Sequence, residues 1–588
     1  MRRVLVVVLF AIAAALGIWF GRHWGSSKTS SAAVTALLPR ETLAFLHIPD
    51  VNGARAKWRE TDLYKLWREP AVQEFLQKPL ANAPNVDNAR ARFDQLAPLH
   101  LKDVFFAITA WENQKATMLA GFRFRGEPED AEKIIGGWRT RLEENAPAAK
   151  RETIEYEKHH IDVATHDAVT LATVYDGNWF FAANDLDALK ELLDRADGRS
   201  KDGGPTLATD EEFIAGSRHM PAIYAARVYA RVDRYIEKAL SNLPPEQRGD
   251  QRAALLGQLG SISGAFAFDG GKMRDVLFVG MPKTTPEELK RSSLTLASRD
   301  TFLYLATFLQ FPRGLPNMNS APAGGVAFPA RQFLGSLNTE AITAELWTAA
   351  FGPELGIIGE WAANSRVPFV FATLPIKDAA RAAELVAAMT AGGEGAAWTK
   401  AESDAVQYYA QPPVSPMLPI APSIALSKDR LVVGHDQPAL QALMRRTSSD
   451  FSGTDVFRAA ERAVPAGNTG FLYFDTALFY TRLDAAIRPM LVLAAAFMPS
   501  IAQTVDLGKL PPPEVITKHL SPIVMSQRYL DSGYVTESVG PISLFQGLAA
   551  VAAGTGVTAG LNANRLPALT QPSPAQPAPS PTQPPDEE

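Results

Sequence analysis

The sequence feature that most constrains the fold is an internal repeat, because a repeated sequence predicts a repeated structural unit. Matching segments lie 244–259 residues apart and keep the same order along the chain. They are 38–46 with 297–305, 180–192 with 431–443, and Phe213 with Phe457. This collinearity predicts two tandem related domains, over 36–285 and 286–540. Two similar layouts with chance matches are the alternative interpretation.

Hairpins interrupted by helices recur in each unit, which indicates an α+β fold with antiparallel sheets and packed helices. Asp176-Gly177 and Gly270-Gly271 separate pairs of apolar runs, as two-residue hairpin turns do. Asp185 precedes a helical pattern, and Asp436 occupies the same place in the second unit. An aspartate in this position accepts backbone N–H bonds, so we interpret both as helix N-caps.

The N-terminus predicts one transmembrane helix before the two domains. Arg2 and Arg3 are followed by an apolar run over 4–20, close to the shortest length that spans a bilayer. We therefore interpret 1–24 as an uncleaved signal anchor and 25–35 as a linker, with a cleaved signal peptide as the alternative. The positive-inside rule predicts a single-pass inner-membrane protein with a cytoplasmic N-terminus and its bulk in the periplasm or outside the cell.

Composition excludes several classes of protein. The chain of 588 residues has no cysteine, which excludes disulfides, thiol catalysis, cysteine-based metal sites and lipoprotein anchoring. Its net charge of −5 argues against a nucleic-acid partner, which requires a basic excess. The tail over 570–588 is rich in proline, alanine and glutamine, and this composition predicts disorder.

Two uncharged segments distinguish the second unit from the first. They cover 489–505 and 540–564, and the later one belongs to an apolar small-residue segment over 541–569. Three interpretations stay open: helices buried between domains, an apolar surface for a lipid or protein partner of the envelope, or a second membrane span. Large exposed apolar patches mark interaction sites, which is why we single these segments out.

Two segments approach motifs for catalysis or cofactor binding, but neither matches the required pattern. The Gly-x-Ser-x-Gly pattern of serine hydrolases is approached at 260–264, but Ile262 takes the place of the nucleophile. The glycines of 554–560 are spaced too widely for a dinucleotide fingerprint, so no cofactor is expected.

The densest group of residue types that can bind a metal ion gives only a weak signal for a metal site. Strand alternation places His160, Asp162 and His166 on one face and His159 on the other. Imidazole and carboxylate suit zinc, but a solvated strand face explains the same residues. The comparable stretch of the second unit, 405–409, has no such set. The three residues are therefore weak metal candidates only.

The opening of the first unit resembles a known family. The residues that carry the resemblance are Leu37, Leu38, Pro39, Thr42, Leu43, Phe45, Pro49 and Asp50, followed by Asn184-Asp185-Leu186 and Leu189. They are similar to the domain-of-unknown-function family numbered three-three-five-two, which consists of bacterial membrane-anchored envelope proteins. The resemblance would cover about 36–540, and it implies an envelope location but no catalytic residue. Ala297-Ser298 departs from the pattern in the second unit.

These observations predict a membrane-anchored envelope protein that acts as a non-catalytic binding, structural or assembly module. Two alternatives remain from the sequence. One is an envelope hydrolase with no recognisable motif, and the other is a lipid-binding carrier or chaperone.

Overall fold

The computed structural model describes the greater part of the chain. The described ranges are 32–81, 97–112, 115–125, 129, 132–137, 140, 149–166, 169–199, 204–241, 259–309, 337–338, 342–391, 397–413, 421–446, 448–497 and 506–543. The expected signal anchor at 1–24, most of the linker at 25–35 and the tail at 570–588 lie outside these ranges. Among the described helices, none is both long and apolar enough to cross a membrane.

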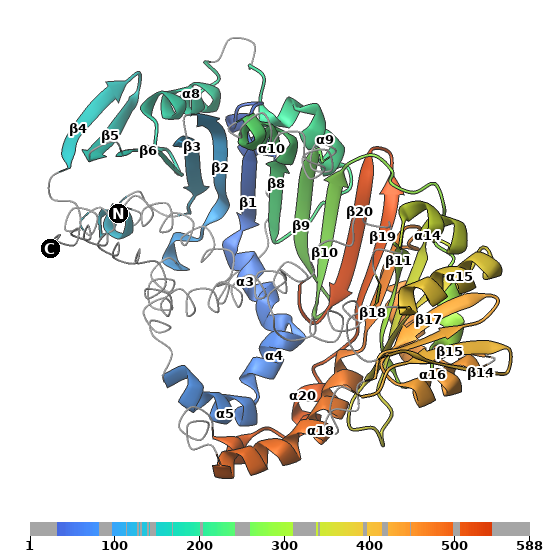
Figure 1. Cartoon of the computed structure of the whole chain (residues 1–588). Helices are drawn as coiled ribbons and strands as arrows, with labels where there is room; N and C mark the ends of the chain where they lie inside the picture. Colours follow the sequence, from blue (N-terminus) through green and yellow to red (C-terminus); the bar gives the residue numbers. More distant parts are fainter. Residues whose placement is uncertain are drawn as a thin grey trace, which may run out of the picture. The chain divides into compact units, whose positions relative to one another are not determined.

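The described residues form an α+β structure around a 20-stranded sheet whose paired strands are antiparallel. In the first half the strands pair in the order β4-β5-β6-β7-β3-β2-β1-β8-β9-β10 (Figure 1). Their bounds are β1 Ala44–Asp50, β2 Lys102–Glu112, β3 Lys115–Arg123, β4 Lys150–Tyr156, β5 His159–His166, β6 Val169–Asp176, β7 Trp179–Ala183, β8 Ala226–Arg231, β9 Ser261–Asp269 and β10 Lys272–Gly280.

The second half repeats this order from the opposite end of the sheet. Its strands pair as β14-β15-β16-β17-β13-β12-β11-β18-β19-β20. Their bounds are β11 Thr301–Phe308, β12 Glu354–Glu360, β13 Phe369–Pro375, β14 Thr399–Ser403, β15 Val406–Ala410, β16 Ser423–Leu426, β17 Arg430–Gly434, β18 Gly470–Phe474, β19 Ile523–Leu530 and β20 Gly533–Gly540.

The two halves meet where β10 pairs with β20 (Figure 1, green beside orange). Val276 is the fifth residue of β10, and it pairs with Glu537, which is the fifth residue of β20. Equivalent residues therefore face each other, as they do across the two-fold axis of a symmetric dimer.

Helices α8, α9, α16 and α17 pack on one face of the sheet, here called the helical face, whereas α15 (Ala379–Thr390) packs on the opposite face against Leu374 and Leu431. In the first half α8 (Leu186–Ala196) and α9 (Glu211–Ser217) bury Leu189 and Phe213 against Tyr229. In the second half α16 (Gln437–Met444) and α17 (Asp455–Arg462) bury Leu440 and Phe457 against Tyr473. The register connects Tyr229 to Tyr473 through strand-paired residues across β9, β10, β20 and β19, so both tyrosines lie on one face.

Local sequence explains where these helices begin. The carboxylates of Asp185 and Asp436 each accept a hydrogen bond from the backbone N–H three residues later, at 3.0 Å. Both predicted N-caps are confirmed. Asp50 likewise caps α3 (Val51–Glu60) by accepting from Gly53 N at 2.8 Å. Such a cap contributes about 1 kcal/mol, and it accounts for these aspartates without a catalytic role.

The remaining helices include α4 (Asp62–Arg68), α5 (Pro70–Ala81), α10 (Val232–Ser241), α14 (Ala344–Ala350), α15 (Ala379–Thr390), α18 (Thr476–Phe497) and α20 (Pro513–Thr517). The uncharged segment 489–505 begins within α18, and residues 498–505 lie outside the described ranges. Of the uncharged segment 540–564, the structure describes residues 540–543.

Candidate functional site

The face of the sheet opposite the helical face is apolar and partly exposed across its centre. On β1, β2, β8 and β10 the side chains of Leu46, Phe106, Val228 and Leu277 are half-buried or exposed. Their sequence neighbours Phe45, Phe105, Tyr229 and Phe278, which point to the helical face, are at most 3 % exposed. Alternation along each strand therefore separates a buried face from a more exposed one.

The strand register makes these residues a continuous surface, here called the open face. Phe106 pairs with Leu46, Leu46 with Val228, and the row continues through Gly264 and Leu277 to Thr536 in the second half. The second half extends the surface with apolar residues on β11, β12, β13, β18 and β19. They are Leu303, Leu305, Ile357, Val370, Leu472 and Met525.

The chemistry of the open face is that of an apolar binding surface. Apart from Gly264 and Thr536, the residues named for the open face have aliphatic, thioether or aromatic side chains, and none of these side chains titrates. Val228 and Val370 are 38 % and 36 % exposed. A contiguous apolar surface of this kind favours an apolar ligand or partner, because covering it removes hydrocarbon from water.

A buried polar cluster lies at the middle of β1, around His47, and differs between the two halves. His47 Nδ1 lies 2.9 Å from the Tyr224 hydroxyl, and His47 Nε2 lies 3.4 Å from Asp103 Oδ1. Arg123 Nη2 is 2.6 Å from the other oxygen of Asp103. The side chains of His47 and Asp103 are 0 % and 1 % exposed. Here Asp103 also has a left-handed backbone, with φ of 46°.

Two of the corresponding positions of the second half are apolar. His47 pairs across strands with Arg227, whereas Ala306 pairs with Phe471 in the second half. Burial lowers the pKa of the Arg227 guanidinium, which reports the cost of placing a charge there. The fold therefore does not require an imidazole or a guanidinium at these two positions, because its second half forms the same strands with Ala306 and Phe471 there.

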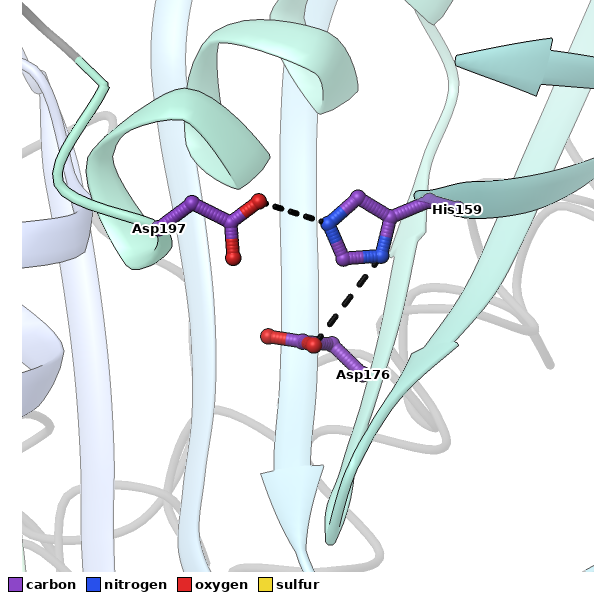
Figure 2. A group of neighbouring side chains, drawn as sticks. All are labelled: His159, Asp176 and Asp197. Carbon is purple, nitrogen blue, oxygen red and sulfur yellow. Dashed lines mark hydrogen bonds and ion pairs between the residues drawn. The ribbon is translucent and has the colours of Figure 1, made fainter. Parts of the chain in front are cut away.

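A second group of titratable residues joins the end of α8 to strands β5 and β6 (Figure 2). The ring of His159 lies between two carboxylates, with Nε2 2.8 Å from Asp197 Oδ2 and Nδ1 3.9 Å from Asp176 Oδ1. Lys158 Nζ is 2.7 Å from the second oxygen of Asp197, and Arg199 contacts Asp197 Oδ2. Burial opposes ionisation of Asp197, but bonds from Lys158 and His159 outweigh it and lower its pKa to about 2.

These contacts favour a structural role for the His159 group. Its three ligand-type residues are close enough to hold a metal ion. However, both oxygens of Asp197 already accept from cations, and a metal ion would have to displace Lys158 and Arg199. The group therefore ties the β4–β5 turn to the C-terminus of α8 through compensated charges.

The metal candidates from the sequence do not converge. His160 is exposed, with Nδ1 4.0 Å from Glu155 Oε1, and Asp162 accepts from Thr153 Oγ1 at 3.0 Å. His166 ends the strand and pairs with Val169. The burial pattern confirms that His159 faces the interior and His160 the solvent. His160 and His166 are six residues apart, so about 20 Å of extended strand separates them.

The sequence does not predict which residues the structure brings together. Asp197 follows His159 by 38 residues, and the His47 cluster combines three strands and a loop. A charged or imidazole side chain inside an apolar strand pattern, as at His47, is the signal that points to such clusters.

Asp197→Asn is expected to lower the free energy of unfolding by roughly 2 kcal/mol at neutral pH, since its pKa is depressed from 3.8 to about 2. A depressed carboxylate pKa stabilises the fold above pH 4, and this contribution is lost as the pH falls towards 2. Urea unfolding of the variant and the parent at several pH values measures both effects. A variant as stable as the parent at pH 7 would contradict this assignment.

Comparisons with known proteins add little. No family model and no curated protein sequence matches the chain. Solved structures of TP0453 are matched at very low similarity. Crystal form III gives a TM-score of 0.21 at 8 % identity, covering 43 % of this chain and 80 % of that chain. Crystal form I gives 0.22 at 8 % identity, covering 45 % and 82 %. Similarity at this level carries no inference about this chain, and the resemblance to the envelope family stays a prediction.

Proposed function

We propose that this chain is a non-catalytic binding module of the bacterial envelope, with two tandem related α+β domains held at the inner membrane by the segment 1–24. Its bulk lies in the periplasm or outside the cell. The repeated strand order and the pairing of equivalent residues at Val276 and Glu537 support the tandem relationship.

The open face is the observation that carries the binding role. Its central side chains are aliphatic or aromatic and partly exposed, whereas the opposite face of the same strands is buried. We propose that the open face binds an aliphatic chain, such as that of a lipid, because it offers hydrocarbon contact and few polar groups. This surface also favours the lipid-binding alternative over a hydrolase.

Charge placed on the open face is expected to weaken ligand binding. Val228→Glu puts a carboxylate where an aliphatic ligand would have to desolvate it, so we expect at least about a tenfold loss, equivalent to 1.4 kcal/mol. The full chain is purified from membranes, and the acyl chains that remain bound are counted by mass spectrometry.

Val456→Glu is the matched control, because Val456 is 50 % exposed on α17, which packs on the helical face. It should retain the parental amount of lipid. Equal lipid on both variants, or none on the parent, would contradict the proposed binding surface. Membrane fractionation tests the anchor separately, because recovery of the intact chain among soluble proteins would contradict it.

A further inference from the structure

Helices from opposite halves of the chain are joined by an ionic contact. The first half contributes the arm α3–α5, which follows β1, and the second half contributes α18 and α20, which follow β18 (Figure 1). Glu69 lies between α4 and α5, and His519 lies just after α20, 450 residues later in the chain. The strand pairing of β10 with β20 is thus not the only connection between the halves.

Glu69 is the centre of this contact. Its Oε1 atom accepts from His519 Nε2 at 2.6 Å and lies 2.9 Å from Lys518 Nζ. A second pair, Glu74 Oε1 with Lys509 Nζ at 3.1 Å, repeats the same polarity along α5. In both pairs the first half supplies the anion and the second half supplies the cation.

The contact is more polar and more exposed than the interior of the sheet. The Glu69 and His519 side chains are 19 % and 13 % exposed, whereas Lys518 is 52 % exposed. Ion pairs at this level of exposure are weakened by salt, because mobile ions screen them. Bonds from Lys518 and His519 lower the pKa of the Glu69 carboxyl, so the carboxylate persists into mildly acidic solution.

We propose that Glu69, Glu74, Lys509, Lys518 and His519 form a clasp between the two halves, which opens when their charges are screened or removed. The clasp holds α5 against α20 and lets the two arms separate while the sheet stays intact. Its existence does not depend on whether the open face binds a ligand.

The absence of cysteine makes the clasp directly measurable. Gln77→Cys on α5 and Glu514→Cys on α20 are exposed positions, and nitroxide labels on them are the only thiol-linked labels that the full chain carries. Double electron–electron resonance then gives the distance distribution between the arms. We expect one narrow distribution at low salt and a several-fold larger population of long distances in about 0.5 M sodium chloride.

Glu69→Gln removes the charge and keeps the shape, so it is expected to show the long distances already at low salt. Glu60→Gln is the control, because Glu60 pairs with Lys57 within α3 at 3.0 Å and does not reach the second half. Circular dichroism verifies that each variant is folded. The clasp is ruled out if the labelled parent shows the same distribution at low and high salt, and this comparison holds even if Glu69→Gln does not fold.

Discussion

Asp103→Asn is expected to lower the free energy of unfolding by about 3 kcal/mol, because it removes the charge from a buried ion pair while its partners remain. Asp103 is 1 % exposed between His47 and Arg123, so the arginine would lose its carboxylate partner. Asparagine tolerates the left-handed backbone at this residue, so the loss reports the charge and not the backbone. Urea unfolding followed by circular dichroism measures it.

Asp404→Asn is a close control for this experiment. Asp404 also has a left-handed backbone, with φ of 55°, and it forms an ion pair with Arg445 at 3.3 Å. Both side chains are about two-thirds exposed, at 66 % and 65 %, so its loss should cost less than about 1 kcal/mol. Equal effects of the two substitutions would show that burial of Asp103 contributes nothing.

Leu277→Pro is expected to lower the free energy of unfolding by at least about 3 kcal/mol. Because it weakens the junction between the halves, it is also expected to split thermal unfolding into two transitions. Leu277 lies inside β10 and pairs with Gly264 on one side and Thr536 on the other. Proline there removes a backbone donor at the place where β10 and β20 join the two halves. Differential scanning calorimetry of the full chain resolves whether the halves still unfold together.

Leu277→Ala separates the backbone from the side chain in this test. It keeps the N–H group and removes only a half-buried side chain, so unfolding should stay a single transition at a lower temperature. If the proline and alanine variants gave the same calorimetric trace, the junction would not couple the halves.

Local features of the fold were predictable from the sequence, because their causes are local. The Gly270-Gly271 turn connects β9 to β10, and Asp185 and Asp436 cap α8 and α16. Hairpin turns and helix caps involve residues within a few positions of each other, and their types are distinctive. The repeat likewise appeared as matched buried residues such as Phe213 and Phe457.

The candidate site was not predictable in the same way. The open face depends on which strands are neighbours, and the pairing of β10 with β20 joins residues that have no local relation. Residue type alone indicates His160, Asp162 and His166 as metal candidates, but an extended strand holds them apart. The His47 cluster is not visible in the sequence, because Asp103, Tyr224 and Arg227 become neighbours of His47 only through the strand order.

The pairing of β10 with β20 also determines the order in which the chain can fold during synthesis. Met273 pairs with Gly540, so β10 is made long before its partner exists. At about 5–20 residues per second, this interval is about 13–53 s. During that time β10 is an exposed strand edge, which is the kind of surface that recruits other chains into aggregates. Strand β20 therefore covers the exposed edge of the first half and also completes the second half. Truncation before β20 would leave an aggregation-prone intermediate.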